Sequence, residues 1–151
     1  MNRTTHRPIC APRRQRGTGL VEVLVAVLVL SFGMLGLAGL QMSALKNNQS
    51  SLERGMAVVQ THSIADAMRA DRTTAINGGF DLALDDEAPT DTTFAAVSLA
   101  TWRTNLINVL GSAGTGQVDC DGSLCTIIVQ WNDERGTGGS TTQQISTQVQ
   151  L

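Results

Sequence analysis

The sequence lacks tyrosine altogether, and aromatic residues make up only 3% of the chain. With so few large rings, a large rigid core is not expected. Motifs of catalysis are also missing: no serine stands in a Gly-x-Ser-x-Gly turn, no glycine-rich loop suits a phosphate, and no Cys-x-x-Cys pair occurs. His62 lies alone on an expected helix. We therefore predict neither an enzyme nor a cofactor.

Basic residues are scarce after residue 17. All 13 acidic residues follow that point, whereas five of the 11 basic residues precede it: Arg3, Arg7, Arg13, Arg14 and Arg16. A basic start followed by an acidic body is typical of an exported protein whose N-terminus stays cytoplasmic. The acidic body has no basic stripe for phosphates, so nucleic acid is not an expected partner.

Residues 23–40 contain no charged side chain and are mostly apolar. About 20 such residues cross a bilayer as a helix. A secretory signal peptide is the alternative, but its apolar part usually spans about 7–15 residues. No small-x-small cleavage site follows this run, so we predict that the helix is retained as a membrane span.

Glu22 is the unusual residue at the start of this span. An acidic side chain at a bilayer centre costs roughly 2.5–3.5 kcal/mol on insertion scales, and less near the edge. Two interpretations are open. Glu22 is a harmless interfacial acid beside Arg16, or it requires a positive partner near the start of the helix. Cleavage after Gly17 would create such a partner, the α-amino group of Thr18.

Residues 16–26 resemble the class III signal of type IV prepilins and type II secretion pseudopilins. The resemblance makes Gly17 the last leader residue, Thr18 the N-methylated first mature residue, and Glu22 the glutamate at the fifth mature position. It also implies that Glu22 pairs with the N-terminal amine of a neighbouring subunit during assembly. Family members usually begin with phenylalanine and threonine, whereas Thr18 and Gly19 stand here; this departure concerns methylation more than cleavage.

The helix is expected to continue to about Ala70, because no proline occurs between Pro12 and Pro89. Apolar residues at helical spacing predict one buried stripe; it contains Leu45, Leu52, Met56, Val59, Ile64 and Met68. Three glycines interrupt the apolar half, namely Gly33, Gly36 and Gly39. They are either ordinary membrane-helix glycines or positions where the helix loosens in a filament.

The second half of the sequence predicts a loop after Ala70, a helix capped by Asp91 and stopped by Gly111, and strands at 124–131 and near residue 151. Trp102 and Trp131 are expected in the core. An Asp-Gly pair at residue 121 predicts a hairpin. The predicted fold class is α+β: a long N-terminal helix, half membrane-spanning and half amphipathic, packed on a small antiparallel sheet.

Cys120 and Cys125 flank the predicted hairpin turn, where opposite positions are close enough for a disulfide. A redox pair or part of a metal site is the alternative, while Cys10 lies in the basic leader. Acidic runs at 85–87 and 133–134 offer oxygen ligands to calcium, but neither has EF-hand spacing. We expect solvated loops there and no metal.

Further resemblance concerns the type of pilin. Residues 48–50 (Asn-Gln-Ser), 64–71 and 126–133 are similar to PilV-type minor pilins. This implies a leader at 1–17, a membrane or filament-core half-helix at 18–41, and a periplasmic head at 42–151. It also implies a single-pass inner-membrane protein that reaches the pilus tip after assembly.

The implied partners are the prepilin peptidase and N-methyltransferase, other minor pilins, the major pilin and a tip adhesin. Two alternatives remain open. One is a type II secretion pseudopilin, which shares the leader. The other is a signal-anchored periplasmic enzyme or sensor, in which the leader stays attached.

Overall fold

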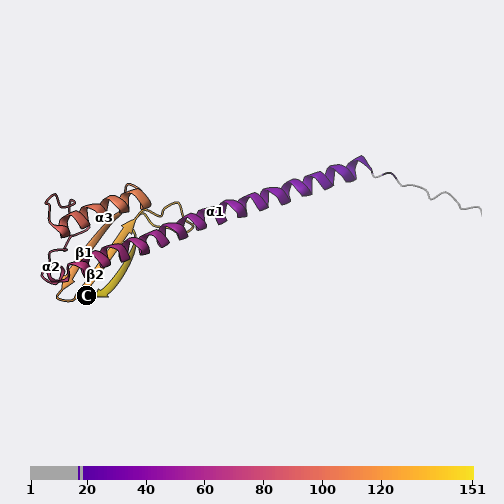
Figure 1. The fold of residues 1–151 in the computed structure, drawn as a ribbon. Coiled ribbons are helices and arrows are strands. Elements are labelled where there is room, and N and C mark those ends of the chain that lie inside the picture. Colours follow the sequence, from indigo (N-terminus) through magenta and orange to yellow (C-terminus); the bar gives the residue numbers. More distant parts are fainter. Residues whose placement is uncertain (1–16, 18) are drawn as a thin grey trace, which may run out of the picture. The chain divides into compact units, whose positions relative to one another are not determined.

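The computed structural model describes Gly17 and residues 19–151. The predicted leader, up to residue 16, and Thr18 lie outside the described residues. The elements in chain order are α1 (Leu20–Ala70), α2 (Arg72–Ile76), α3 (Phe94–Leu110), β1 (Thr115–Asp121), β2 (Leu124–Trp131) and β3 (Gln143–Gln150) (Figure 1). The predicted α+β fold, with a long N-terminal helix on a small antiparallel sheet, is confirmed. The chain divides into two compact units within α1, one ending at Leu40 and one covering Gln41–Leu151.

The three strands form one antiparallel sheet in the order β1-β2-β3. Asp121 pairs with Leu124 at the end of the first hairpin. Gly122 adopts a φ of 58° in the two-residue turn, a left-handed conformation that glycine takes without steric cost. Alternate residues of β2 are buried, starting with Cys125 and ending with Trp131. The period-two pattern of the sequence therefore predicted this strand and its buried face correctly.

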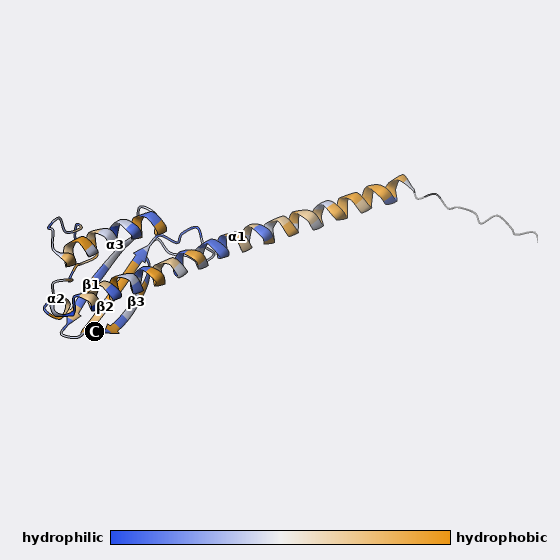
Figure 2. Cartoon of the chain, viewed as in Figure 1, coloured by the Kyte–Doolittle hydropathy of each residue, from blue (hydrophilic) through white to orange (hydrophobic). Residues whose placement is uncertain are grey.

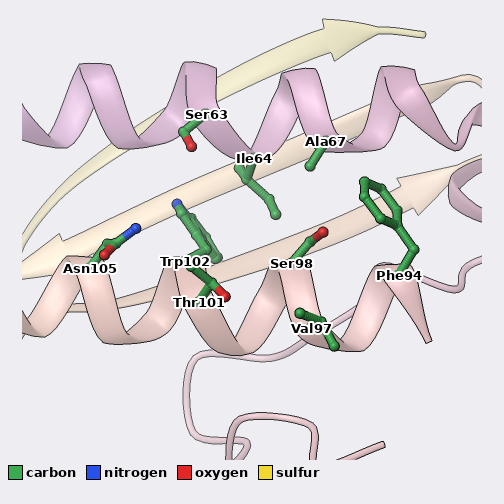
Figure 3. A pocket seen from close by; sticks show the side chains of 9 residues that line it. All are labelled: Ser63, Ile64, Ala67, Phe94, Val97, Ser98, Thr101, Trp102 and Asn105. Atoms are coloured by element: carbon green, nitrogen blue, oxygen red, sulfur yellow. The ribbon is translucent and has the colours of Figure 1, made fainter. Parts of the chain in front are cut away.

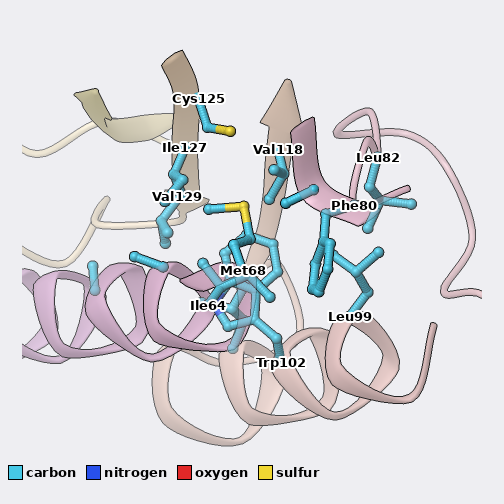
Figure 4. Packing of buried hydrophobic residues seen from close by; sticks show 14 of the residues in the cluster. Ile64, Met68, Phe80, Leu82, Leu99, Trp102, Val118, Cys125, Ile127 and Val129 are labelled. Atoms are coloured by element: carbon cyan, nitrogen blue, oxygen red, sulfur yellow. The ribbon is translucent and has the colours of Figure 1, made fainter. Parts of the chain in front are cut away.

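The core of the second unit joins α1, α3 and the sheet in one cluster of apolar side chains. Figure 4 shows Met68 of α1 and Trp102 of α3 close to side chains of β1 and β2. Both tryptophans are buried as predicted, with 2% of Trp102 and 0% of Trp131 exposed. The indole Nε1 of Trp102 also donates to the backbone carbonyl of Gln60, at 2.9 Å, and so ties α3 to α1.

The predicted buried stripe of α1 is only partly correct. Ile64 and Met68 are buried, but four predicted members are between 38% and 64% exposed: Leu45, Leu52, Met56 and Val59. The other buried positions of the helix are Ala57, Thr61 and Ala65. These small side chains let the helix backbone approach the core closely, so the face that carries them, together with Ile64 and Met68, turns inward. The other four predicted members lie on more exposed faces of the helix.

Two further predictions about local structure were wrong. The segment after Ala70 is not all loop, because Asp71 caps the short helix α2 by accepting a bond from the Thr74 N–H at 3.3 Å. Helix α3 is capped by Thr93, whose hydroxyl accepts from the Ala96 N–H, and not by Asp91. The Asp91 carboxylate instead accepts from the side chain and N–H of Thr93, and these bonds lower the pKa of Asp91.

Residues 81–84 cover the outer edge of β1. Leu82 and Val118 exchange two backbone hydrogen bonds of 2.9 Å, and the Asp81 Oδ1 accepts from the Cys120 N–H at 3.0 Å. The Arg103 guanidinium, on α3, donates to the carbonyls of Ala83 and Leu84. Partial burial lowers the pKa of Arg103, although acidic neighbours at 85 and 86 oppose this.

Asp81→Asn is expected to stabilise the head at neutral pH but not in acid. Desolvation raises the pKa of Asp81 above 3.8, and the nearby negative charge of Asp119 raises it further. The hydrogen bond from the Cys120 N–H lowers the pKa but does not outweigh the desolvation. The stability contributed by Asp81 is therefore full below pH 3.8 and falls as pH rises through its raised pKa. Asparagine retains an Oδ1 acceptor without the charge. Urea unfolding at several pH values measures this; an equal effect at all pH values would contradict it.

Candidate functional site

The start of α1 holds the residues that the sequence singled out. The carbonyl of Gly19 accepts from the N–H groups of Glu22, at 2.9 Å, and Val23, at 3.3 Å, so the helix begins at Leu20. Glu22 lies in the first turn, where the helix dipole favours a negative charge. Its side chain is exposed, and among the residues that the structure describes no basic group pairs with it. The positive partner expected for Glu22 therefore stays a prediction.

The first part of α1 is apolar on all sides. Every large apolar side chain from Leu20 to Leu40 is at least half exposed, and that of Leu20 reaches 83%. An 18-residue window has a mean hydropathy of 2.5 with none of it buried (Figure 2). The one hydroxyl in the span, that of Ser31, donates to the Val27 carbonyl at 2.7 Å. Such a helix is stable only where lipid or other apolar surfaces cover it, so the segment is consistent with membrane anchoring.

Gly33, Gly36 and Gly39 lie on this same part of α1, which remains helical through all three. A Cβ built at any of them would meet no atom within 4 Å. At a spacing of three, the glycines lie close to one another along the helix surface and allow another helix to approach closely. The loosening of the helix at these positions stays a prediction.

Asp133 forms a polar contact with α1 that the sequence analysis missed. The side chain is 2% exposed, the Ser50 hydroxyl donates to its Oδ2 at 2.6 Å, and a guanidinium nitrogen of Arg54 lies 3.9 Å away. The contact is possible because Gly136 and Gly139 lie very close to Asp133 and have no side chain to collide with it. A Cβ on Gly136 would lie 2.8 Å from the Asp133 Oδ1. The loop after β2, expected to be solvated, is thus fixed to α1. The only sequence signal for this was the density of glycine after Asp133.

Cys120 and Cys125 are joined by a disulfide, with the two sulfur atoms 2.07 Å apart. They face each other directly across the β1–β2 hairpin, one pair from its turn. The acidic run at 85–87 is exposed, and His62 is also exposed on α1. Within residues 17 and 19–151, no group of three or more histidine, cysteine or carboxylate side chains is suitable for a metal ion.

A groove of about 250 Å³ lies between α1 and α3 (Figure 3). Ile64, Phe94 and Trp102 supply much of its apolar lining. The polar lining consists of hydroxyl groups and the amide of Asn105, with no charged side chain. This lining has no base to activate a hydroxyl and offers nothing for acid–base catalysis.

Comparison with known proteins gives one match. The model of the prokaryotic N-terminal methylation motif matches residues 12–38, which include Gly17, Thr18, Glu22 and most of the apolar run. Searches of curated proteins and of solved structures found no match. The motif implies processing by a prepilin peptidase and assembly with other pilins. Together with the pilin-like architecture of helix and sheet, it supports a type IV pilin-like protein.

Proposed function

We propose that this chain is a minor pilin of the PilV type that helps to initiate type IV pilus assembly. The observation that carries the proposal is the methylation motif on a helix that is apolar on all sides, with one acid in its first turn. A membrane holds this helix before assembly. In a filament, the helices of neighbouring subunits replace the lipid.

Cleavage after Gly17 supplies the positive partner that Glu22 lacks. It frees the α-amino group of Thr18, which the methyltransferase then methylates without removing its positive charge. The glutamate of an incoming subunit pairs with the amine of a neighbour. In apolar surroundings such a pair is favourable only when both partners are present, so it sets the register between subunits.

The contact between Ser50 and Asp133 supports the PilV type. Each residue belongs to a stretch that resembles PilV-type pilins, and the structure brings the two together at 2.6 Å. The partners are then other minor pilins, the major pilin and a tip adhesin.

The division of the chain follows from this function. Residues 1–17 are the leader, 18–41 the membrane and filament half of the helix, and 42–151 the periplasmic head. The compact unit that begins at Gln41, one residue before the proposed head, supports the last boundary. The protein crosses the inner membrane once, with its N-terminus cytoplasmic, and moves to the pilus tip.

A type II secretion pseudopilin is the second candidate, because the methylation motif is common to both classes. Deleting the gene separates the two functions. Loss of twitching motility with normal protein secretion supports the minor pilin. Loss of secretion with normal motility supports the pseudopilin.

Gly17→Val is expected to leave uncut precursor in the inner membrane, because the larger side chain occupies the last leader position. Immunoblotting of membranes would show nearly all of the chain at the longer size. Gly19→Ala is the matched control, since a Cβ at Gly19 meets no atom within 4 Å. For the control, N-terminal sequencing should begin at Thr18. Normal mature protein from the Gly17→Val variant would contradict cleavage at this site.

A further inference from the structure

The amphipathic half of α1 carries a second apolar face, separate from the one that the head buries. Its members are spaced by three and four residues in turn, and we call them the seam: Met42, Leu45, Gln49, Leu52, Met56 and Val59. The five apolar members are between 38% and 64% exposed, and Gln49 is exposed as well. Most of this face therefore lies uncovered in the described part of the chain.

The spacing of the seam is that of a coiled coil. It averages 3.5 residues, so the stripe keeps facing a partner helix that winds around it. The members occupy heptad positions a and d in turn, beginning with Met42 at a. The buried residues of α1 all fall at positions b, c or f of the same repeat, namely Ala57, Thr61, Ile64, Ala65 and Met68. The head and a partner helix can thus use different faces of α1.

In sequence, the same spacing begins well before the seam. The earlier a and d positions hold no charged residue; they are Val21, Leu24, Leu28, Ser31, Leu35 and Ala38. The repeat from residue 21 to residue 59 exceeds the three to four heptads that indicate a coiled coil. The charged residues of this stretch all lie at other heptad positions, namely Glu22, Lys46, Glu53 and Arg54.

We propose that the seam pairs with the seam of a second copy of this chain, in a parallel and in-register dimer at the membrane. The proposal rests on the proposed function in one respect, that the membrane holds α1 by its N-terminal part. Both copies are then anchored in the same direction, so their helices run parallel. Anchoring in one membrane also raises the effective concentration of one copy around another, which favours pairing.

Gln49 selects both the partner and the register. Its amide, which donates to the Glu53 Oε1 at 3.2 Å, belongs to the one polar side chain of the seam. A single polar residue at an a position fixes the register, because it is satisfied only opposite another polar group. In register, each Gln49 faces its own equivalent, whereas a shift of one heptad sets it against Met42 or Met56. A second copy therefore fits better than a helix with an aliphatic residue at this height.

The residues that flank the seam bring no like charges together. In a parallel dimer, a residue at position g lies beside the partner residue five positions later, at position e. Lys46 then lies beside Gln41 of the other copy. Glu53 lies beside Asn48. Neither charged side chain meets its own equivalent, so the flanks are compatible with a second copy.

The dimer differs in register from the contact proposed for the filament. In the dimer, Glu22 lies level with its own equivalent, at a b position away from the a and d stripe. In the filament, Glu22 pairs with the amine of residue 18, four residues earlier in sequence. That pairing requires one helix to be displaced along the other by about 6 Å. The dimer is therefore a stage before assembly, and assembly must separate or slide the two copies.

Disulfide trapping of Leu52→Cys in the full chain, within native membranes, tests the pairing. Cys10→Ser is added, so that the new thiol is the one free cysteine beside the Cys120–Cys125 bond. Ser51→Cys is the matched control, since residue 51 is also exposed but lies at position c, turned away from the partner. Mild oxidation should give at least about tenfold more dimer from Leu52→Cys than from the control. Equal yields would overturn the proposal, whether the seam is free or covered by another subunit.

Two variants that carry tags of different size test the register. Leu45→Cys and Leu52→Cys, expressed together, place their cysteines one heptad apart, about 10 Å along the helix axis. Each variant should form a dimer with itself and at least about tenfold less mixed dimer. Gln49→Leu should raise the share of mixed dimer about tenfold, because a shifted register then leaves no amide unpaired. Mainly mixed dimer from the native seam would refute the in-register pairing, and an unchanged share with Gln49→Leu would refute the role of Gln49.

N-terminal sequencing of the trapped sample separates this inference from the proposed function. Dimers whose chains begin at Thr18 support both. Dimers of uncut chains would support the pairing and count against the proposed cleavage. Chains that begin at Thr18 but stay monomeric would overturn the dimer and leave the proposed function standing.

Discussion

Glu22→Leu is expected to be cleaved normally but to enter filaments at least about a hundredfold less than the native chain. Breaking a buried charge pair by removing one partner costs about 3–5 kcal/mol, and about 1.4 kcal/mol corresponds to a factor of ten. The free ammonium of Thr18 would remain unpaired among apolar helices. The measurement is the amount of the chain in sheared filaments, relative to the amount in membranes.

Two matched variants isolate the role of charge at this position. Glu22→Gln keeps the size and polarity of the side chain and should assemble as poorly as leucine. Glu22→Asp keeps the charge and should recover part of the assembly. Native incorporation of the leucine variant would count against the charge pair and would favour a signal-anchored protein, for which Glu22 has no partner to lose.

Trp131→Ala is expected to destabilise the head by about 3–5 kcal/mol, the usual range for truncating a buried aromatic ring. The side chain is 0% exposed and belongs to the central cluster. A small domain has only about 5–15 kcal/mol of stability, so this change removes a large part of it. Urea unfolding of the full chain in detergent, followed by circular dichroism, measures the loss.

The two tryptophans should respond differently to phenylalanine. The Nε1–H of Trp102 donates to the Gln60 carbonyl, whereas the buried Nε1–H of Trp131 has no partner among the described residues. Trp102→Phe loses a hydrogen bond, and Trp131→Phe removes an unsatisfied donor. Trp131→Phe should therefore cost less, by roughly 1–3 kcal/mol. An equal or larger loss for Trp131→Phe would show that shape, and not hydrogen bonding, dominates at both sites.

Local patterns predicted the elements of the fold well but the details of packing poorly. Alternation predicted β2, the Asp-Gly pair predicted the hairpin, and Gly111 ends α3 with a φ of 90°. The helical spacing of apolar residues predicted α1 correctly but did not predict which face of the helix packs against the core. Several apolar faces were available, and close approach to the core selected the one with small side chains, a choice that depends on the sheet and α3.

The contact between Ser50 and Asp133 could not be predicted from local patterns, because 83 residues separate the two in sequence. An acidic residue in a glycine-rich loop is usually solvated. Here the glycines let the loop fold back so that the carboxylate meets a hydroxyl on α1. For the candidate site, the sequence alone was enough to single out Glu22, since an isolated acid in an apolar run is unusual without any tertiary context; its pairing role stays a prediction.

The position of the disulfide bears on how the chain would mature after the proposed cleavage. The chain has three cysteines, and removal of the proposed leader takes Cys10 away, which leaves a single possible pairing. The two remaining thiols are five residues apart in sequence. They can meet as soon as the hairpin forms, before distant segments arrive. Oxidation would then need no isomerase to correct mispaired intermediates, even in a chain that is still emerging from the translocation machinery.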